Sequence, residues 1–175
     1  QDGGSLEMWS AGCASGEEAY SLSMLAKECI ELSGARLYYG VTGTDISNAA
    51  LIAARSARYK ERHLHGVNPA IRDRYMLQTE HGTWEVSQAL KERVCFVQSN
   101  LVNSEELLGI QMDVIFCQNV LIYFRDNCKQ QVLKSLVEHL KPGGILVLGQ
   151  GEAMGWEHPG VSRVRSKLLD AYIRH

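Results

Sequence analysis

The stretch Trp9–Ser21, WSAGCASGEEAYS, joins a predicted strand to a predicted helix through a loop of small residues. The apolar segment Leu6–Ser10 is typical of a buried strand. A helical period begins at Glu17 and continues to about Leu32, and Gly34 then ends the helix. A strand, a glycine-containing loop and a helix in this order predict the first unit of an α/β fold. The apolar residues predicted on one face of the helix are Leu22, Leu25, Ala26 and Cys29.

The same alternation of strands and helices continues along the chain. Ser47 is placed to cap a short helix from Asn48 to about Ala57. Asp126 is placed to cap a longer helix that ends near Leu140, where the sequence KPGG closes it. The further strands are predicted at 37–44, 94–98, 113–117 and 145–148. The buried side of the longer helix is predicted to carry Val132, Leu133, Leu136, Val137 and Leu140.

The C-terminal segment departs from this alternation. Two short strands are predicted at about Val161–Arg165 and Leu168–Ile173, with a tight turn at Ser166–Lys167. No helix-length segment separates the two strands, so we expect them to pair antiparallel.

The whole pattern predicts one α/β domain over residues 1–175, with a parallel, doubly wound sheet that is covered on both faces. The segment at about 57–93 is much longer than an ordinary αβ loop of about 2–6 residues. Within it, RYMLQTEHGTWEV (Arg74–Val86) contains two β-like runs around a glycine-containing turn. We therefore predict a small inserted β-subdomain in this segment.

Composition narrows the class of protein. The chain has 175 residues, 45% of them hydrophobic, and a net charge of −2. This charge gives no general attraction to nucleic acid or an anionic membrane, and no apolar run or signal peptide predicts membrane insertion or export. The five cysteines lack paired spacing, and three fall in apolar or strand-like contexts, so we expect reduced thiols and a cytoplasmic protein. His63 and His65 form no ligand cluster, so no metal is predicted. The chain starts just before its first strand, so we expect an excised domain.

The glycine-containing loop has the composition of a ligand site. Gly12 and Gly16 allow the backbone to approach a ligand closely. Ser15 and Glu18 have the spacing of a capping box, which leaves Glu17 either to complement the helix dipole or to bind a ligand. The loop lacks GxGxxG, lysine and arginine, and its two carboxylates would repel a diphosphate. A cationic ligand, or one rich in hydroxyl and amine donors, fits better.

Polar residues follow the next three parallel strands in the same way. Asp45 ends the second strand, Asn100 follows the third and Asn119 follows the fourth. The carboxyl ends of parallel strands share one edge of the sheet, so these side chains are expected near the first loop. Asp45 either forms a turn or binds the two hydroxyls of a ribose, and the two amides bind either their own loops or a ligand.

Several stretches together resemble the CheR family of chemotaxis-type S-adenosylmethionine-dependent protein-glutamate O-methyltransferases. The resemblance covers about Leu6 to Ile173 and is carried by WSAGCASGEEAYSL, TDIS, ARYKERHL, SNLV, MDVIFCQNVLIYF and LKPGGILVLGQGE. It implies a Rossmann-like methyltransferase sheet, mostly parallel and seven-stranded, with an antiparallel C-terminal strand and a small inserted β-subdomain. It also implies methyl transfer from S-adenosylmethionine, with S-adenosylhomocysteine as product, to glutamate side chains on the cytoplasmic helices of chemoreceptors.

The resemblance also implies roles for individual residues. The cofactor-binding residues would be Ala11, Gly12 and Ser15 around the methionine part, Glu17 at its amino group, Asp45 at the ribose, Asn100 and Leu101 beside the adenine, and Gln118 and Asn119 near the sulfonium. Tyr123 would face the transferred methyl group, so it is the predicted catalytic residue. Val120, Leu121 and Ile122 are expected to anchor its turn, and the alternative for Tyr123 is an ordinary core aromatic.

The chain departs from the family pattern at several places. Gln118 stands where the family usually has arginine, Ala19 where it has proline, and GQGE (Gly149–Glu152) where it often has GHSE. The family's helical N-terminal domain, which supplies basic residues for the receptor, is missing from these 175 residues. Some family members bind a receptor tail peptide through the β-subdomain. The basic residues that would serve such a contact, or simply a solvated surface, are Arg55, Arg58, Lys60, Arg62, Arg72 and Arg74.

The implied reaction needs few residues. A glutamate acceptor has a reference pKa of about 4.3 and is already ionised near neutral pH, so no general base is predicted. A dry site and an in-line arrangement then remain as the requirements, and Tyr123 is the candidate for positioning the acceptor. Two alternatives stay open: a methyltransferase for another acceptor, such as a small molecule or RNA, and a cofactor-binding regulatory or scaffold domain without turnover.

Overall fold

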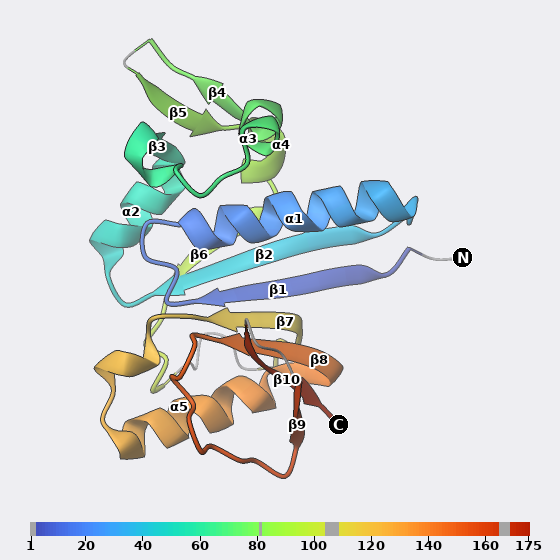
Figure 1. The fold of residues 1–175 in the computed structure, drawn as a ribbon, viewed down its shortest axis with the longest axis vertical. Helices are drawn as coiled ribbons and strands as arrows, with labels where there is room; N and C mark the ends of the chain where they lie inside the picture. Colours follow the sequence, from blue (N-terminus) through green and yellow to red (C-terminus); the bar gives the residue numbers. More distant parts are fainter. Residues whose placement is uncertain (1–2, 81, 104–108, 165–168) are drawn as a thin grey trace.

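One mixed sheet forms the centre of the molecule. The computed structural model describes residues 3–80, 82–103, 109–164 and 169–175. Seven strands lie in the order β6-β2-β1-β7-β8-β10-β9 (Figure 1). Their bounds are β1 Ser5–Ala11, β2 Tyr38–Asp45, β6 Val94–Gln98, β7 Met112–Cys117, β8 Leu140–Leu148, β9 Val161–Val164 and β10 Asp170–Arg174. Neighbours from β6 to β8 are parallel, whereas β10 is antiparallel to both β8 and β9. The predicted fold class, with its antiparallel C-terminal strand, is confirmed.

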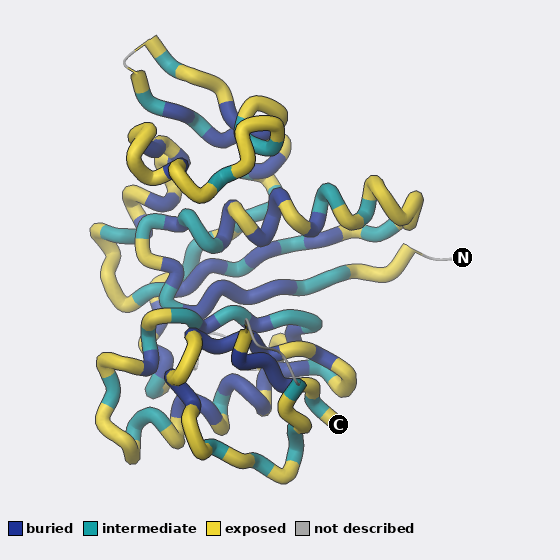
Figure 2. The backbone as a smooth tube through the Cα atoms, in the orientation of Figure 1, coloured by how far each residue is buried: buried dark blue, intermediate teal, exposed yellow. Residues whose placement is uncertain are grey.

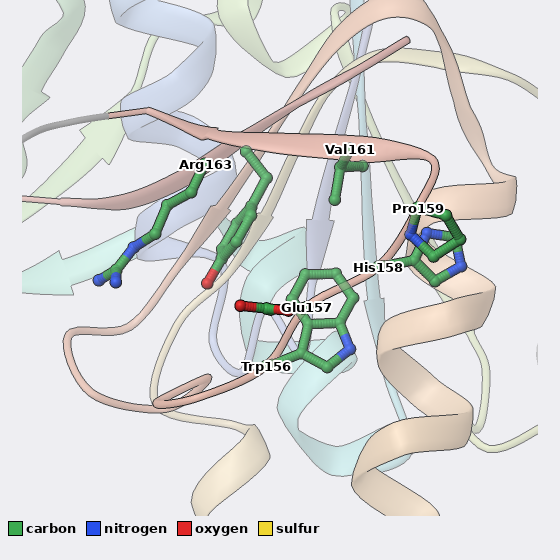
Figure 3. A pocket seen from close by; sticks show the side chains of 7 residues that line it. Trp156, Glu157, His158, Pro159, Val161 and Arg163 are labelled. Atoms are coloured by element: carbon green, nitrogen blue, oxygen red, sulfur yellow. The ribbon is translucent and has the colours of Figure 1, made fainter.

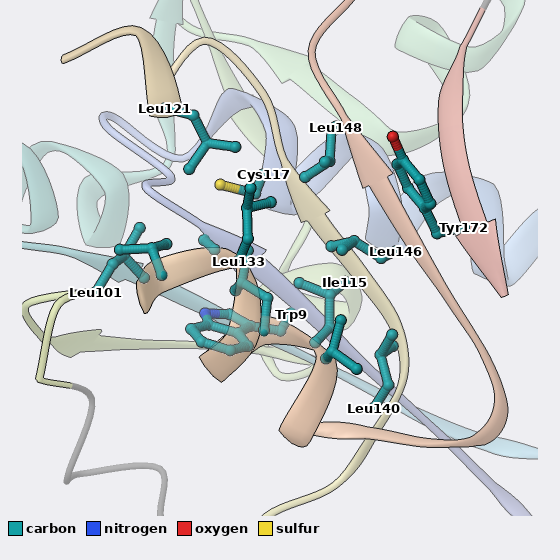
Figure 4. Packing of buried hydrophobic residues seen from close by; sticks show 14 of the residues in the cluster. Trp9, Leu101, Ile115, Cys117, Leu121, Leu133, Leu140, Leu146, Leu148 and Tyr172 are labelled. Atoms are coloured by element: carbon teal, nitrogen blue, oxygen red, sulfur yellow. The ribbon is translucent and has the colours of Figure 1, made fainter. Parts of the chain in front are cut away.

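Side chains of the central strands alternate between two buried faces. Met8 of β1 pairs in register with Val41 of β2 and Val114 of β7. All three belong to or pack against the hydrophobic cluster under helix α1 (Glu17–Ser33). Trp9 and Ile115, one residue further along β1 and β7, belong to the hydrophobic cluster under helix α5 (Asp126–Glu138). Figure 2 shows this burial along the central strands, and Figure 4 shows the α5 side of the sheet in detail. The near-continuous apolar strands therefore have the burial that a doubly covered parallel sheet requires.

Helix α1 (Glu17–Ser33) has the predicted bounds but a different buried face. Gly34 ends the helix in the left-handed region, with φ 65°. Leu25 is 58% exposed and Cys29 is also exposed, so the prediction that they face the core is wrong. The segment at about 57–93 packs against the side of α1 that carries Tyr20 and Met24, so the buried stripe is displaced toward that side. The residues of the stripe are Ala19, Tyr20, Leu22, Ser23, Met24 and Ala26.

Helix α2 (Asn48–Ser56) begins as predicted, because the Ser47 hydroxyl accepts a hydrogen bond from the amide of Ala50 at 3.2 Å. Helix α5 (Asp126–Glu138) differs from the prediction at both ends. Its N-cap is Arg125, without a side-chain cap, and Asp126 lies inside the first turn. The predicted buried residues within α5 itself are confirmed.

Leu140 belongs to β8 rather than to α5, and the KPGG sequence lies inside the strand. Leu140 pairs with Met112, and the register then shifts before Ile145 pairs with Val114. At Gly144 a Cβ would lie 2.8 Å from the Lys141 carbonyl oxygen, so this irregularity requires glycine. The KPGG sequence therefore forms an irregular stretch near the start of a strand instead of ending a helix.

A second sheet of three strands is inserted between α2 and β6 (Figure 1). The predicted hairpin corresponds to β4 (Met76–Gln78) and β5 (Thr83–Val86), and β3 (Arg58–Lys60) adds an unpredicted antiparallel edge. Short helical segments, also unpredicted, complete the insert: η1 Glu61–His63, α3 Pro69–Tyr75 and α4 Gln88–Lys91.

The two C-terminal strands pair antiparallel as predicted. The predicted turn at Ser166–Lys167 lies outside the described residues. Within the described ranges, none of the helices has the length and apolar character needed to cross a membrane.

Candidate functional site

The strand order reverses beside β1, since the chain proceeds to β2 and β6 on one side and to β7 and β8 on the other. Ligands of open parallel sheets bind at such a reversal, outside the carboxyl ends of the strands. A cavity of about 600 Å³ lies there, and its walls come from the segments that follow β1, β2, β6 and β7. The predicted meeting of these four segments at one edge is confirmed.

The loop after β1 approaches two other segments closely. The amides of Gly12 and Cys13 both donate to the Thr44 carbonyl at 2.8 Å, which ties the loop to the end of β2. Gly12 has φ 81°, and a Cβ at this position would lie 2.5 Å from Cγ2 of Val120. The backbone of Gly12 therefore forms part of the cavity wall at a point where a side chain does not fit.

Asp45 both shapes this loop and faces the cavity. Its Oδ2 accepts a hydrogen bond from the amide of Ala14 at 2.9 Å, and its Oδ1 accepts one from the amide of Ser47 at 2.8 Å. A carboxylate oxygen has more than one acceptor position, so both oxygens retain capacity for a donor on a ligand. The two alternatives for Asp45, a turn or a ligand contact, are therefore compatible.

The capping box predicted for Ser15 and Glu18 is wrong. Gly16, with φ 90°, is the N-cap of α1, and no side chain caps the helix. The Ser15 hydroxyl instead donates to the carboxylate of Glu17, with oxygen–oxygen distances of 2.9 and 2.8 Å. Glu18 accepts a hydrogen bond from the Ser10 hydroxyl at 2.6 Å. Glu18 therefore remains on the cavity wall beside Glu17.

Acidic groups dominate the electrostatics of the cavity. Glu17, Glu18 and Asp45 line it, and the described lining contains neither lysine nor arginine. Burial raises the pKa of Glu18 above its ordinary value, and the bond from Ser10 partly opposes this rise. Burial, followed by the charge of Asp45, raises the pKa of the Cys13 thiol to about 12, so this thiol stays protonated near neutral pH. The wall favours a cationic ligand and offers no activated cysteine.

The inserted sheet contributes to the same loop. The Tyr59 hydroxyl donates to the Ser15 carbonyl at 2.9 Å, and burial raises the pKa of Tyr59 above its ordinary value. His63 places its Nδ1 at 3.4 Å from Oε1 of Glu17. Sequence reasoning missed both contacts, because the ARYKERHL motif is distant in sequence from the loop that it supports.

The segment after β7 forms the opposite wall. Asn119 has φ 59°, a conformation that asparagine tolerates better than most residues. Leu121 is buried and anchors the short 3₁₀ helix η3 (Leu121–Tyr123), whereas Ile122 is 62% exposed and does not anchor it as predicted. Tyr123 is 82% exposed and lines the cavity, which contradicts the alternative that it is a core aromatic.

Most of the predicted site residues lie on the cavity wall. Ala11 does not, because it is fully buried in the core, and the lining also excludes Ser15. The Oδ1 of Asn100 accepts a hydrogen bond from the amide of Val102 at 3.1 Å, so this side chain bonds to its own loop and does not line the cavity. The predicted residues on the wall are Gly12, Glu17, Asp45, Leu101, Gln118, Asn119 and Tyr123.

Several lining residues were missed, and most of them are direct neighbours of predicted ones. The spacing of Glu18 from Ser15 suggested a cap, and Val120 was expected to anchor the turn that carries Tyr123. The missed residues on the wall are Cys13, Ala14, Glu18, Ile46, Ser99, Val120 and Phe124.

A second cavity, of about 540 Å³, lies at the far edge of the sheet (Figure 3). Trp156 forms one wall and packs edge-on against Tyr172, and Arg163 at the rim is paired with Asp170. This cavity does not gather polar groups from several strand ends, so the cavity beside β1 is the stronger candidate. Throughout the described ranges, no three His, Cys, Asp or Glu side chains are grouped to hold a metal ion.

Solved structures share this architecture. A TehB-like S-adenosylmethionine-dependent methyltransferase from Corynebacterium glutamicum matches with a TM-score of 0.53 and 14% identity, over 97% of this chain and 78% of that one. The glycopeptide N-methyltransferase MtfA, in complex with sinefungin, matches with a TM-score of 0.52 and 17% identity, over 97% of this chain and 52% of that one. The fold is therefore that of the S-adenosylmethionine-dependent methyltransferases.

Sequence relatives narrow the class. Residues 1–168 match the family described as the CheR methyltransferase, SAM binding domain. Chemotaxis protein methyltransferase 1 of Pseudomonas aeruginosa is 40% identical over 85% of this chain and 55% of its own length. The chemotaxis protein methyltransferase of Escherichia coli is 33% identical over 85% of this chain and 52% of its own length. The chain belongs to the CheR methyltransferase family, as its S-adenosylmethionine-binding domain, and spans about half the length of these relatives.

Proposed function

We propose that the domain binds S-adenosylmethionine in the cavity beside β1 and transfers its methyl group to glutamate side chains of a chemoreceptor. The observation that carries this proposal is the pair of carboxylates, Glu17 and Asp45, on one cavity wall at the strand reversal of a CheR-family domain. The cofactor has hydroxyl and ammonium donors and a positively charged sulfonium. These groups match an acidic wall whose described residues include no lysine or arginine.

The residues present fit the cofactor as follows. Asp45 would accept hydrogen bonds from the ribose hydroxyls, and Glu17 would bind the ammonium group. Leu101 offers apolar surface for the adenine. Gln118 and Asn119 would lie near the sulfonium, from the opposite wall.

The bound cofactor supplies an electrophilic methyl group on a positively charged sulfur. The protein has to hold an already ionised acceptor carboxylate in line with that methyl group and to exclude water. Tyr123 is suited to position the acceptor, because it is exposed and lines the cavity. We assign no general base, since the acceptor needs none.

We further propose that the acceptor lies on a cytoplasmic helix of the receptor, so the domain acts in the cytoplasm. A receptor tail peptide would bind at an edge of the inserted sheet, where β4 presents Leu77, 70% exposed. Salt bridges to Glu85 and Glu61 already occupy Arg58 and Arg72, which makes these two basic residues less available to an acidic partner.

Calorimetry with S-adenosylmethionine tests the first step. We expect saturable binding to the chain, and Asp45→Ala should weaken it by about 1–3 kcal/mol, the scale for loss of a charged acceptor. Asp73→Ala is the matched control, because Asp73 is an exposed carboxylate on α3. Absence of binding by the parent chain, or equal affinity of the parent and Asp45→Ala, would contradict the proposal.

Methyl-labelled cofactor and a chemoreceptor cytoplasmic domain test the second step. Transfer should produce base-labile label on glutamate, and Tyr123→Phe should reduce it without changing cofactor affinity. Intact binding without any transfer would favour the alternative of a regulatory domain without turnover. Equal labelling by the parent and Tyr123→Phe would remove the positioning role of Tyr123.

A further inference from the structure

Glu152 is a buried carboxylate outside the wall of the cavity. It follows β8 in the segment Gly149–Glu152 and is only 4% exposed. Its Oε2 accepts hydrogen bonds from the amides of Gly149 and Asn119, both at 2.9 Å. Its Oε1 accepts one from the amide of Ile122 at 3.2 Å. All three partners are N–H donors, which matches the acceptor-only character of an ionised carboxylate.

The backbone on both sides of Glu152 is shaped around it. At Gly149 a Cβ would lie 2.0 Å from Oε2 of Glu152, so only glycine leaves room for the carboxylate. Asn119 has φ 59°, and its amide points to the same oxygen. The charge-assisted hydrogen bond from this amide helps to hold Asn119 in the left-handed conformation.

Asn119 and Ile122, whose amides bond to Glu152, lie in the segment after β7, which forms the cavity wall opposite the loop that carries Glu17 and Glu18. Asn119 itself lines the cavity, its neighbour Gln118 does so too, and Tyr123 follows Ile122. These residues are exposed or half-buried, so packing holds the segment mainly through Leu121, between the two amides that donate to Glu152. We infer that Glu152 is a positioning residue, which holds the segment after β7 in the shape that binds the cofactor. The inference rests on the proposed function of the cavity.

Glu152→Gln is the direct test, because it conserves volume and removes one acceptor oxygen. Both carboxylate oxygens accept backbone amides, so the new side-chain N–H₂ group must face at least one backbone N–H. Two hydrogen-bond donors then face each other in a buried place, and neither has an acceptor. We expect the dissociation constant for S-adenosylhomocysteine, measured by calorimetry, to rise at least about tenfold. Amide hydrogen exchange at Asn119 and Ile122 should accelerate in the same variant.

Asp113→Asn is the matched control. Asp113 also accepts a backbone amide, from Glu7 at 2.7 Å, and a lysine, Lys141, at 2.7 Å, but it lies at the amino end of β7, away from the cavity. This variant should lose stability without changing ligand affinity or the exchange of Asn119. If Glu152→Gln and Asp113→Asn weaken binding equally, Glu152 is merely structural and the inference is overturned.

Two further readouts separate this inference from the proposed function. In the parent protein, the amides of Asn119 and Ile122 should exchange slowly although both residues are exposed, and rapid exchange overturns the inference even if Glu152→Gln fails to fold. A parent protein with slow exchange but no affinity for S-adenosylhomocysteine refutes the proposed function and leaves the positioning of the segment supported. A folded Glu152→Gln variant with unchanged affinity and unchanged exchange overturns the inference.

Discussion

Replacement of Gly12 by alanine tests whether the loop after β1 is held by the close approach of the segment after β7. Gly12 has φ 81°, and its added Cβ would lie 2.5 Å from Cγ2 and 3.2 Å from Cγ1 of Val120. Gly34 provides a matched comparison, because it also has a positive φ, 65°, but no atom lies within 4 Å of its added Cβ. The two substitutions share the backbone strain and differ in the clash.

The structure sets the expected magnitudes. A left-handed alanine costs about 1–2 kcal/mol at either site, and the overpacking against Val120 adds about 1–3 kcal/mol at Gly12 alone. The loss of freedom of the unfolded chain offsets about 0.4–1 kcal/mol in both variants and cancels in the comparison. Gly12→Ala should therefore reduce the free energy of unfolding by about 1–3 kcal/mol more than Gly34→Ala.

Urea unfolding followed by circular dichroism measures both losses, and Val120→Ala completes the cycle. In the Val120→Ala background the clash is absent, so Gly12→Ala should then cost no more than Gly34→Ala. Equal destabilisation by the two glycine substitutions in the parent background would refute the reasoning, and so would the absence of any rescue by Val120→Ala.

Three other predictions follow from the surroundings of the cavity. Burial raises the pKa of Glu18 above 4.5, so the folded protein binds a proton on this carboxyl more tightly than the unfolded chain does. Protonated Glu18 therefore contributes to the free energy of unfolding at low pH, and this contribution is lost as pH rises through the folded-state pKa. Glu18→Gln should thus become more stable relative to the parent from pH 4.5 towards neutral, as urea titrations at several pH values would show. Tyr59→Phe removes the donor to the Ser15 carbonyl and should cost about 0.5–1.5 kcal/mol in the same assay. Iodoacetamide should label the exposed Cys29 well before Cys13, whose pKa is about 12, as mass spectrometry of timed samples would reveal.

The sheet was predictable because its determinants are local and periodic. Each parallel strand contains a short apolar run, and each predicted helix has a clear period or an end signal such as Ser47 or Gly34. The errors occur where tertiary contacts decide. The inserted sheet covers one side of α1 and leaves Leu25 in solvent, and no local pattern contains that information.

The candidate site was predictable to the level of position but not of side-chain direction. Asp45 ends β2 and Asn119 lies two residues after β7, so both reach the cavity at the carboxyl ends of their strands, as the fold requires. Asn100 occupies an equivalent position, yet its side chain turns back to its own loop. Ser15 and Glu18 have the spacing of a capping box, but they do not bond to each other's amides. The Ser15 hydroxyl donates to Glu17, and Glu18 accepts a hydrogen bond from Ser10.

The hydrogen bonds of the loop after β1 explain its choice of ligand. Phosphate-binding loops present free backbone amides to the anion. Here the amides of Gly12 and Cys13 donate to the Thr44 carbonyl. The amide of Ala14 donates to Asp45, and the amide of Gly16 donates to the Cys13 carbonyl. The loop therefore resembles a dinucleotide-binding loop in its glycines but has the opposite polarity: it shows a ligand mainly acceptors. Donor groups of a nucleoside with a positively charged side chain satisfy such a wall, whereas a diphosphate would meet the carboxylates of Glu17, Glu18 and Asp45 and no lysine or arginine among the described lining residues.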